Sequence, residues 1–347
     1  MSHEIDLSKY EVRTDLIIEA IDKESIKNID RITKEEDNIK VDSVTISKKN
    51  EKDFNKKRGN YITISFDDVT DILNQKKLEK VFKSEFTDFL SKMNILDSDK
   101  CLVVGLGNSN STPDSLGPKV VDNIVVTKHL FDIDGIDVLD EYRNVSAIKP
   151  SVLALTGIET RDIIKGIISI SKPDFLIIVD ALSSSSISRV NKTIQITDTG
   201  ISPGSGVGNN RGELSKDTLG IPVIGIGVPT VVDAVTIVSD TINFMMKKFS
   251  YSKKNIDSYK DKLKPLNKIN YLDIETELST SDKKKIMGEV GILSKNEIKQ
   301  LIFEVLTPIG YNMMVTPKEV DFVIDKLSIV ISNVINRSLH KNVKIID

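Results

Sequence analysis

Two aspartates are the side chains of this sequence best placed to do chemistry. Asp114 lies in a turn soon after the apolar run Cys101–Leu106, and Asp180 comes directly after a second apolar run. Short apolar runs rich in β-branched residues are typical of strands buried on both faces of a parallel sheet. Open α/β sheets place ligands and catalytic groups at the carboxyl ends of such strands. We therefore expect the two carboxyl groups to share one site.

A pair of neighbouring carboxyl groups can activate water for hydrolysis. Two close carboxyls cannot both ionise at low cost, so one tends to keep a proton while the other accepts one from water. Taken alone, Asp114 fits a helix cap or turn, whereas the charge of Asp180 at a buried strand end is costly unless it is paired or hydrogen-bonded. Asp198 and Asp233 are secondary candidates, and Asp233 also fits the first turn of a helix.

Other catalytic chemistries have less support. Gly105–Asn110 (GLGNSN) resembles the beginning of a dinucleotide fingerprint but lacks its third glycine, and no G-x-x-x-x-G-K-[ST] loop occurs. The sequence has no G-x-S-x-G elbow and no H-E-x-x-H motif. We expect His129 to be structural and Cys101 to be a small buried hydrophobe, not a nucleophile. Carboxylates remain as the catalytic groups.

A glycine-rich segment follows the predicted strand at 193–198. Gly204, Ser205, Gly206 and Gly208 belong to this segment. It fits either a plain turn or a loop whose backbone N–H groups bind substrate or stabilise a tetrahedral intermediate.

Alternating strands and helices must position these residues. We predict strands at 101–106, 152–156, 174–180, 193–198 and 221–227, and helices near 116–131, 159–171 and 230–249. This alternation predicts an α/β fold of three layers, with a mixed or mostly parallel sheet and helices on both faces. Upstream, the alternating stretch Ile39–Ser47 is typical of an exposed strand, and Tyr61–Phe66 is a further strand candidate. Leu78–Met93 has the apolar spacing of an amphipathic helix.

The chain divides into four predicted regions. Residues 1–15 form a charged arm, 16–249 the α/β catalytic domain, 250–290 a lysine-rich surface excursion or linker, and 291–347 helices packed on the catalytic domain. In the last region Thr316-Pro317-Lys318-Glu319 is a helix start signal, with Thr as the cap and Pro in the first turn.

Composition limits the class of protein. The 347 residues carry a formal net charge of −3, which gives no reason to expect nucleic-acid binding. One cysteine excludes an internal disulfide and is typical of a reducing compartment. The beginning of the sequence is polar, and no run has the roughly 18 apolar residues that a membrane span requires. We expect a cytoplasmic protein.

Motifs along nearly the whole length resemble the germination protease family of spore-forming bacteria. They are DLS and VRTDL near the start, LVVGLGN, TPDSLGP, ALTGIET, KPDFLIIVDAL, TIQITDTGI, GVPTVVDAV, and MVTPKEVD near the end. Members of this family are atypical aspartic endopeptidases that degrade small acid-soluble spore proteins during germination. The resemblance implies that the catalytic aspartates are Asp114 and Asp180.

The resemblance also implies how the enzyme is made and assembled. Family members are zymogens that remove a short propeptide themselves, which places the cut here between Asp15 and Leu16. The family enzyme is a homotetramer of the forespore or spore core, and its fold is similar to that of hydrogenase-maturation peptidases. Those peptidases add a metal-binding histidine that has no match in this sequence, so we expect no metal and no cofactor. Residues 247–268, and the region to about 285, match the family poorly.

Two alternatives remain open on the sequence. One is a metal-assisted maturation peptidase of the hydrogenase type. The other is a non-enzymatic nucleotide-binding module built on the glycine turn after Cys101–Leu106.

Overall fold

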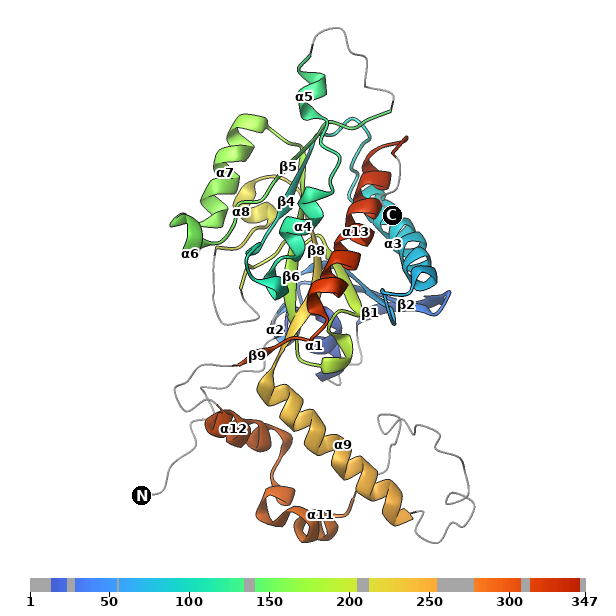
Figure 1. The fold of residues 1–347 in the computed structure, drawn as a ribbon, viewed down its shortest axis with the longest axis vertical. Coiled ribbons are helices and arrows are strands. Elements are labelled where there is room, and N and C mark those ends of the chain that lie inside the picture. Colours follow the sequence, from blue (N-terminus) through green and yellow to red (C-terminus); the bar gives the residue numbers. More distant parts are fainter. Residues whose placement is uncertain are drawn as a thin grey trace. The chain divides into compact units, whose positions relative to one another are not determined.

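The computed structural model describes residues 14–23, 29–54, 56–133, 141–204, 212–254, 278–306 and 313–343 (Figure 1). Contacts divide the chain into two compact units. The larger comprises Arg13–Val231 with Thr316–Asp347, and the smaller is built around Val232–Val315.

A twisted mixed sheet forms the centre of the larger unit, in the order β1-β2-β3-β7-β8-β6-β4-β5. The strands are β1 Asp30–Glu36, β2 Ile39–Ile46, β3 Gly59–Ser65, β4 Cys101–Gly105, β5 Val145–Ile148, β6 Phe175–Ser184, β7 Thr193–Thr197 and β8 Val223–Asp233. Strand β4 pairs in parallel with β5 and with β6, whereas β1, β2, β3, β7 and β8 pair antiparallel in succession. With helices on both sides, the mixed α/β architecture expected from the sequence is confirmed.

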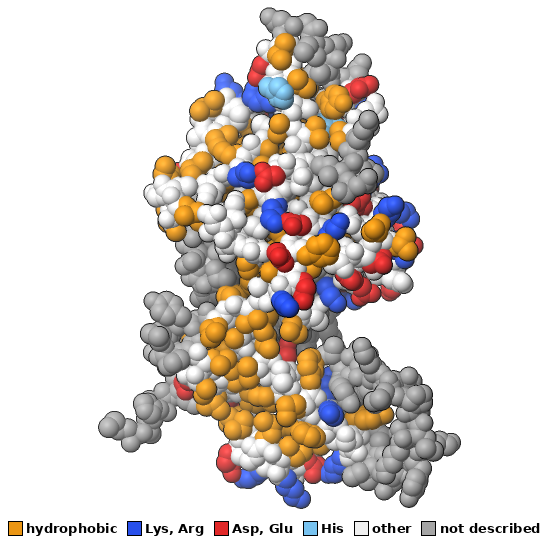
Figure 2. Space-filling view, viewed as in Figure 1, with side chains coloured by type: hydrophobic (Ala, Val, Ile, Leu, Met, Phe, Trp, Pro, Cys, Tyr) orange, Lys and Arg blue, Asp and Glu red, His pale blue; other side chains and the backbone are white. Residues whose placement is uncertain are grey.

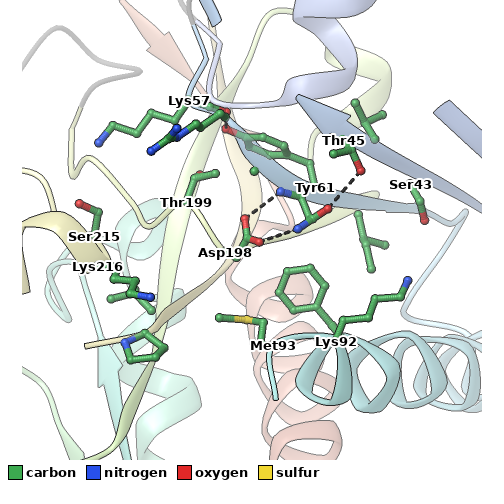
Figure 3. A pocket seen from close by; sticks show the side chains of 18 of the residues that line it. Ser43, Thr45, Lys57, Tyr61, Lys92, Met93, Asp198, Thr199, Ser215 and Lys216 are labelled. Carbon is green, nitrogen blue, oxygen red and sulfur yellow. Dashed lines mark hydrogen bonds between the residues drawn. The ribbon is translucent and has the colours of Figure 1, made fainter. Parts of the chain in front are cut away.

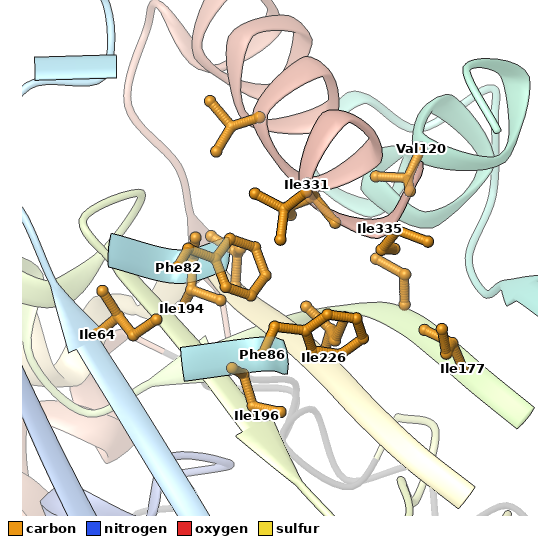
Figure 4. Close-up of a cluster of buried hydrophobic side chains, with 14 of the residues drawn as sticks. Ile64, Phe82, Phe86, Val120, Ile177, Ile194, Ile196, Ile226, Ile331 and Ile335 are labelled. Atoms are coloured by element: carbon orange, nitrogen blue, oxygen red, sulfur yellow. The ribbon is translucent and has the colours of Figure 1, made fainter. Parts of the chain in front are cut away.

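One face of this sheet is covered by three helices. They are α3 (Ile72–Lys92), α4 (Leu116–Asp122) and α13 (Val320–Leu339). Phe82 and Phe86 of α3 point onto the strands, and Ile331 of α13 lies beside them (Figure 4). The apolar spacing of α3 and α13 produces this cluster, because residues three and four apart share one helix face. The last helix therefore completes the core of the larger unit.

The other face is covered by shorter elements. Helix α7 (Thr160–Ser171) packs Ile164 against Leu176 and Ile178 of β6, together with Leu219 of α8 (Lys216–Leu219). Farther along the sheet, α1 (Ile17–Lys23) packs against β2 and β3 through Ile17. The remaining helices of this unit are α2 (Glu51–Phe54), α5 (Lys128–Phe131) and α6 (Leu153–Thr156).

The smaller unit is helical. Helix α9 (Ala234–Lys254) packs on α12 (Lys295–Leu306) through Val235, Ile302 and Phe303. Helix α11 (Thr280–Met287) precedes α12, and the short strand β9 (Met314–Val315) pairs with the end of β8. Asp233 caps α9, because its carboxylate accepts hydrogen bonds from the N–H and hydroxyl of Thr236 at 2.7 Å each. None of the described helices is long and apolar enough to span a bilayer.

Several expected features differ in the structure, among them the boundary between the strand predicted at 221–227 and the helix predicted at 230–249: β8 extends to Asp233 and α9 begins at Ala234. The run 152–156 is not a strand: Leu153–Thr156 forms helix α6, which ends at Gly157 with φ +70°. The periodicity of so short an apolar run does not distinguish a strand from a helix. Here Gly157, which ends the helical turn, was the signal that favoured the helix. The expected helix 116–131 is two helices, α4 and α5. Helix α13 begins at Val320, so Thr316 does not cap it and instead donates to the carbonyl of Thr230.

The amino-terminal part of the sheet also departs from expectation. Ile39–Ser47 corresponds to β2, which is an inner strand with alternate buried residues and is not an exposed one. Its partner β1 was missed, because its sequence DRITKEE is charged and fully exposed at the sheet edge. A turn signal was present: Asp37 and Asn38 both have positive φ, as the two central residues of a type I′ hairpin require.

Candidate active site

Asp180 is a buried carboxyl group on β6. Asp180 is only 6% exposed, and its Oδ1 accepts a hydrogen bond from the N–H of Ala181 at 2.9 Å. Beside it, the N–H of Leu106 donates to the carbonyl of Val179 at 2.8 Å, which continues the parallel pairing of β4 and β6. Asp180 therefore lies level with the end of β4, where the chain leaves the sheet toward Asp114.

Asp114 ends a 3-10 turn, η2 (Thr112–Asp114), between β4 and α4. The N–H of Asn108 donates to the Asp114 carboxylate at 2.9 Å and to its carbonyl at 3.0 Å. Gly107 makes this closure possible: its φ is +115°, and a Cβ there would overlap the Asp114 carbonyl. The turn thus holds the Asp114 carboxylate in one orientation.

Close packing joins this turn to Asp180's strand. Gly117, in the first turn of α4, lies against the ends of both parallel strands, so that an added Cβ would be 2.5 Å from the Val179 carbonyl oxygen and 2.6 Å from the Leu106 nitrogen. Thr230 of β8 donates to the carbonyl of Pro113 at 2.6 Å. Asp114 and Asp180 consequently lie at the same edge of the sheet, as the strand ends predicted.

The segment around Asp15 and Leu16 lies along the continuation of β6. The N–H of Asp15 donates to the carbonyl of Ser183 at 3.2 Å, and the N–H of Ser183 donates to the Asp15 carboxylate at 2.9 Å. Leu16 is fully buried and clusters with Ile18 and Leu182. The peptide bond between Asp15 and Leu16 therefore lies a few residues along the strand that carries Asp180.

Glu19 of α1 anchors this segment. Its buried carboxylate accepts hydrogen bonds from the hydroxyl of Ser184 at 2.5 Å and from the N–H and hydroxyl of Ser185 at 2.7 and 2.8 Å. Arg189 is 3.6 Å away, and Thr14 also donates to the carboxylate. Glu19 was not among the residues predicted from the sequence, although the run of serines that follows Asp180 was a signal that a polar partner lies nearby.

Asp198 belongs to a different part of the sheet. Its carboxylate accepts from the N–H and the side-chain amide of Asn60 at 2.8 and 2.7 Å, and it lines a cavity of ≈ 740 Å³ with Thr199, Lys57 and Lys216 (Figure 3). Burial raises the pKa of the neighbouring Tyr61 to about 12. This cavity also includes Val223, where β8 begins, so the structure does not bring Asp198 to Asp114.

The glycine-rich loop lies largely outside the described residues. Gly204 is described and has φ +72°, whereas Ser205, Gly206 and Gly208 are not among the described residues. The two interpretations of this loop both stand.

The structure describes two histidines, His129 and His340, of which only His129 was expected to have a structural role. His340 is buried, its Nδ1 accepts the N–H of Arg143 at 3.2 Å, and burial lowers its pKa. His129 is exposed on α5. Within the described part of the chain, no three His, Cys, Asp or Glu side chains gather as metal ligands would.

The thiol of Cys101 is expected not to react with thiol reagents in the folded protein. It lies in β4 between β5 and β6, is 1% exposed, and burial raises the pKa of its thiol. Because the thiolate is the reactive form, an aromatic disulfide reagent at pH 8 should titrate no thiol in the native chain and one in guanidinium. Rapid reaction of the native chain would contradict this buried position.

Comparison with known proteins decides the family. A model of the family described as germination protease matches residues 9–346. The chain belongs to the germination protease family. The germination protease of Bacillus licheniformis is 50% identical to it, over 98% of this chain and 96% of its own length. That of Geobacillus sp. (strain WCH70) is 46% identical over 99% and 97%.

Membership in the germination protease family makes this chain a protease and sets aside the nucleotide-binding module. A solved [NiFe] hydrogenase maturation protease, HycI from Thermococcus kodakarensis KOD1, is also similar, with 18% identity and a TM-score of 0.28 over 42% of this chain and 80% of its own. A likeness this small carries no argument about metal or mechanism.

Proposed function

We propose that this protease is a self-processing aspartic endopeptidase that hydrolyses small acid-soluble spore proteins during germination. Asp114 and Asp180 form its catalytic pair, and residues 1–15 are a propeptide removed at the Asp15–Leu16 bond. The observation that carries the proposal is the convergence at one sheet edge: the turn of Asp114 packs against the strand of Asp180, and the bond to be cut lies along the same strand.

The chemistry follows from the two carboxyls. The ionised member accepts a proton from water as the water attacks the peptide carbonyl. The protonated member hydrogen-bonds the carbonyl oxygen and then gives its proton to the leaving nitrogen as the C–N bond breaks. Both aspartates accept a backbone N–H, Asp114 from Asn108 and Asp180 from Ala181, and such a bond favours the ionised form of either carboxyl. The shared proton is therefore a property of the pair, which titrates as a unit, and not of one residue.

The arm's contacts support the zymogen part of the proposal. Asp15 occupies backbone and side-chain hydrogen-bonding positions at Ser183, and Leu16 fills an apolar position on Leu182. A substrate peptide needs the same kind of groups beside the strand of Asp180. The cut releases Asp15 with the propeptide, whereas Leu16 stays as the new first residue, so the positions at Ser183 become free when the propeptide leaves.

The smaller unit supports self-association. Figure 2 shows hydrophobic side chains gathered on the face of this unit that is in view. Its exposed large hydrophobic residues include Met245 and Phe249 of α9, Ile286 of α11 and Val305 of α12. Exposed apolar groups of this kind mark interaction sites on soluble proteins. We assign them to the homotetramer and place the enzyme in the forespore or spore core. We propose that it needs no metal or other cofactor.

A time course of intact mass tests the proposal. The purified chain, held at mildly acidic and at neutral pH, is expected to lose the mass of residues 1–15 in one step, leaving Leu16 as the new first residue. Small acid-soluble spore protein, added before and after the step, should be cleaved only afterwards. Loss of mass at any other bond would contradict the assigned site, and cleavage that a chelator stops would favour metal-assisted chemistry.

A further inference from the structure

Gln195 of β7 holds the backbone on both sides of the Asp15–Leu16 bond. Its Nε2 donates to the carbonyl oxygen of Asp15 at 3.2 Å, and its Oε1 accepts the N–H of Ile17 at 2.7 Å. The two partners fix the orientation of the amide, because a backbone N–H requires the oxygen and a backbone carbonyl requires the NH₂ group. The side chain is buried, at 6% exposure, so water does not compete strongly for these bonds.

The sheet puts Gln195 on the same face as Asp180. Gln195 is paired with Gly227 of β8. The N–H of Leu176 donates to the carbonyl of Pro222, which in a parallel ladder pairs Leu176 with Val223. If this pairing of β6 with β8 continues for four more residues along each strand, Asp180 (176 plus four) lies opposite Gly227 (223 plus four).

Residues opposite one another on neighbouring strands point to the same face of a sheet. Asp180 and Gln195 therefore flank Gly227, with roughly 10 Å between their backbones, twice the usual strand spacing. Gly227 has no side chain, and the position its Cβ would take is filled by Leu182, whose Cγ is 2.5 Å from it. Leu182 in turn contacts Leu16. The residue after the bond thus clusters with the side chain that covers the glycine, while the carbonyl before the bond is held by Gln195.

We propose that Gln195 is the carbonyl-binding residue of this peptidase. The inference rests on the proposed cut at Asp15–Leu16. Water adds its oxygen to the carbonyl carbon of Asp15 and gives a proton to the ionised aspartate, while the carbonyl π electrons move onto the oxygen that Nε2–H binds. The C–N bond then breaks as the electron pair on oxygen returns, and the nitrogen of Leu16 takes a proton from the acidic member of the pair. A donor already aimed at that oxygen stabilises the charge that develops there.

The two hydrogen bonds of Gln195 also have a consequence for substrates. Both are made to backbone atoms, one to a carbonyl and one to the N–H two residues later. Gln195 therefore accepts an extended peptide of any sequence, and selectivity must come from neighbouring groups such as Leu182 and Ser183.

Two substitutions in the full-length chain separate catalysis from structure. Q195E keeps an acceptor for Ile17 and loses the donor for Asp15, and Q195A loses both. At neutral pH each is expected to slow self-cleavage about 10²-fold, the usual cost of removing one such donor. The introduced carboxyl regains an O–H donor when protonated. Its ordinary pKa is about 4.3 and burial raises it, so the ratio of Q195E to wild type should rise toward mildly acidic pH.

The outcomes are distinct. Q75E, the same exchange at a half-buried glutamine near the beginning of α3, should follow the wild type at every pH, since an acidic side chain is favoured there. If Q195E and Q195A are equally slow at all pH values, or if both stay within threefold of wild type, Gln195 is not the carbonyl donor, and the proposed function stands without it. Where Q195E does not fold, a Q195A rate within threefold of wild type still overturns the assignment. A wild-type chain that never loses residues 1–15 overturns the self-processing and this inference together.

Discussion

Asp180→Asn is expected to lower the rate of both self-cleavage and substrate cleavage by about 10³-fold or more, with the fold unchanged. The asparagine has the same shape, and its carbonyl oxygen can still accept the N–H of Ala181. It cannot accept or release a proton near neutral pH, and general acid–base groups contribute up to about 10⁴-fold to a rate. Intact mass follows self-cleavage, and a separate assay follows small acid-soluble spore protein.

Asp198→Asn is the matched control. It follows strand β7, which is separated from β6 by β8, and its carboxylate accepts hydrogen bonds from Asn60 at a cavity that does not include Asp114 or Asp180. An amide can replace most of that bonding, so cleavage should continue at close to the wild-type rate. If Asp180→Asn retains more than a tenth of the wild-type rate, or if Asp198→Asn is the slower of the two, the assignment of the pair is wrong. Asp114→Asn should match Asp180→Asn in both assays.

The positions of the two aspartates could be anticipated because each depends on local sequence. The apolar runs at Cys101–Gly105 and Phe175–Val179 form strands β4 and β6, and parallel pairing of the two brings their ends together. The length of β6 was underestimated: the predicted strand ended at Asp180, whereas β6 continues to Ser184, and Leu182, Ser183 and Ser184 are buried. Strand β8 was underestimated in the same way, since it continues past 227 to Asp233.

The partners of the amino-terminal segment could not be anticipated in the same way. Gln195 meets Asp15 across 180 positions of sequence, and Glu19 meets Ser185 across 166. Nothing in the local pattern of a strand residue tells which distant backbone it will bind. A buried glutamine within the run TIQIT was nevertheless a usable signal, because its amide must find partners inside the protein.

Gly117→Ala is expected to affect stability and activity together. The added Cβ would meet the Val179 carbonyl oxygen and the Leu106 nitrogen at 2.5 and 2.6 Å, and both are backbone atoms of the sheet, which cannot rotate away. Overpacking of this kind costs about 3 kcal/mol, measured as the free energy of unfolding in denaturant. The first turn of α4 has to move outward, and it carries the turn of Asp114 away from Asp180. A displacement of about 1 Å in a catalytic group can cost about 10²-fold in rate.

Gly166→Ala separates this packing effect from the general effect of removing a glycine. Gly166 lies inside helix α7, and a Cβ there would have no atom within 4 Å. Alanine is favoured over glycine in a helix by about 1 kcal/mol, so this variant should be slightly more stable than wild type and fully active. If Gly117→Ala unfolds at the wild-type denaturant concentration, the close contact of α4 with β4 and β6 is not real. If Gly117→Ala is destabilised but cleaves at the full wild-type rate, the position of Asp114 does not depend on that contact. This result would contradict the geometric argument for the catalytic pair.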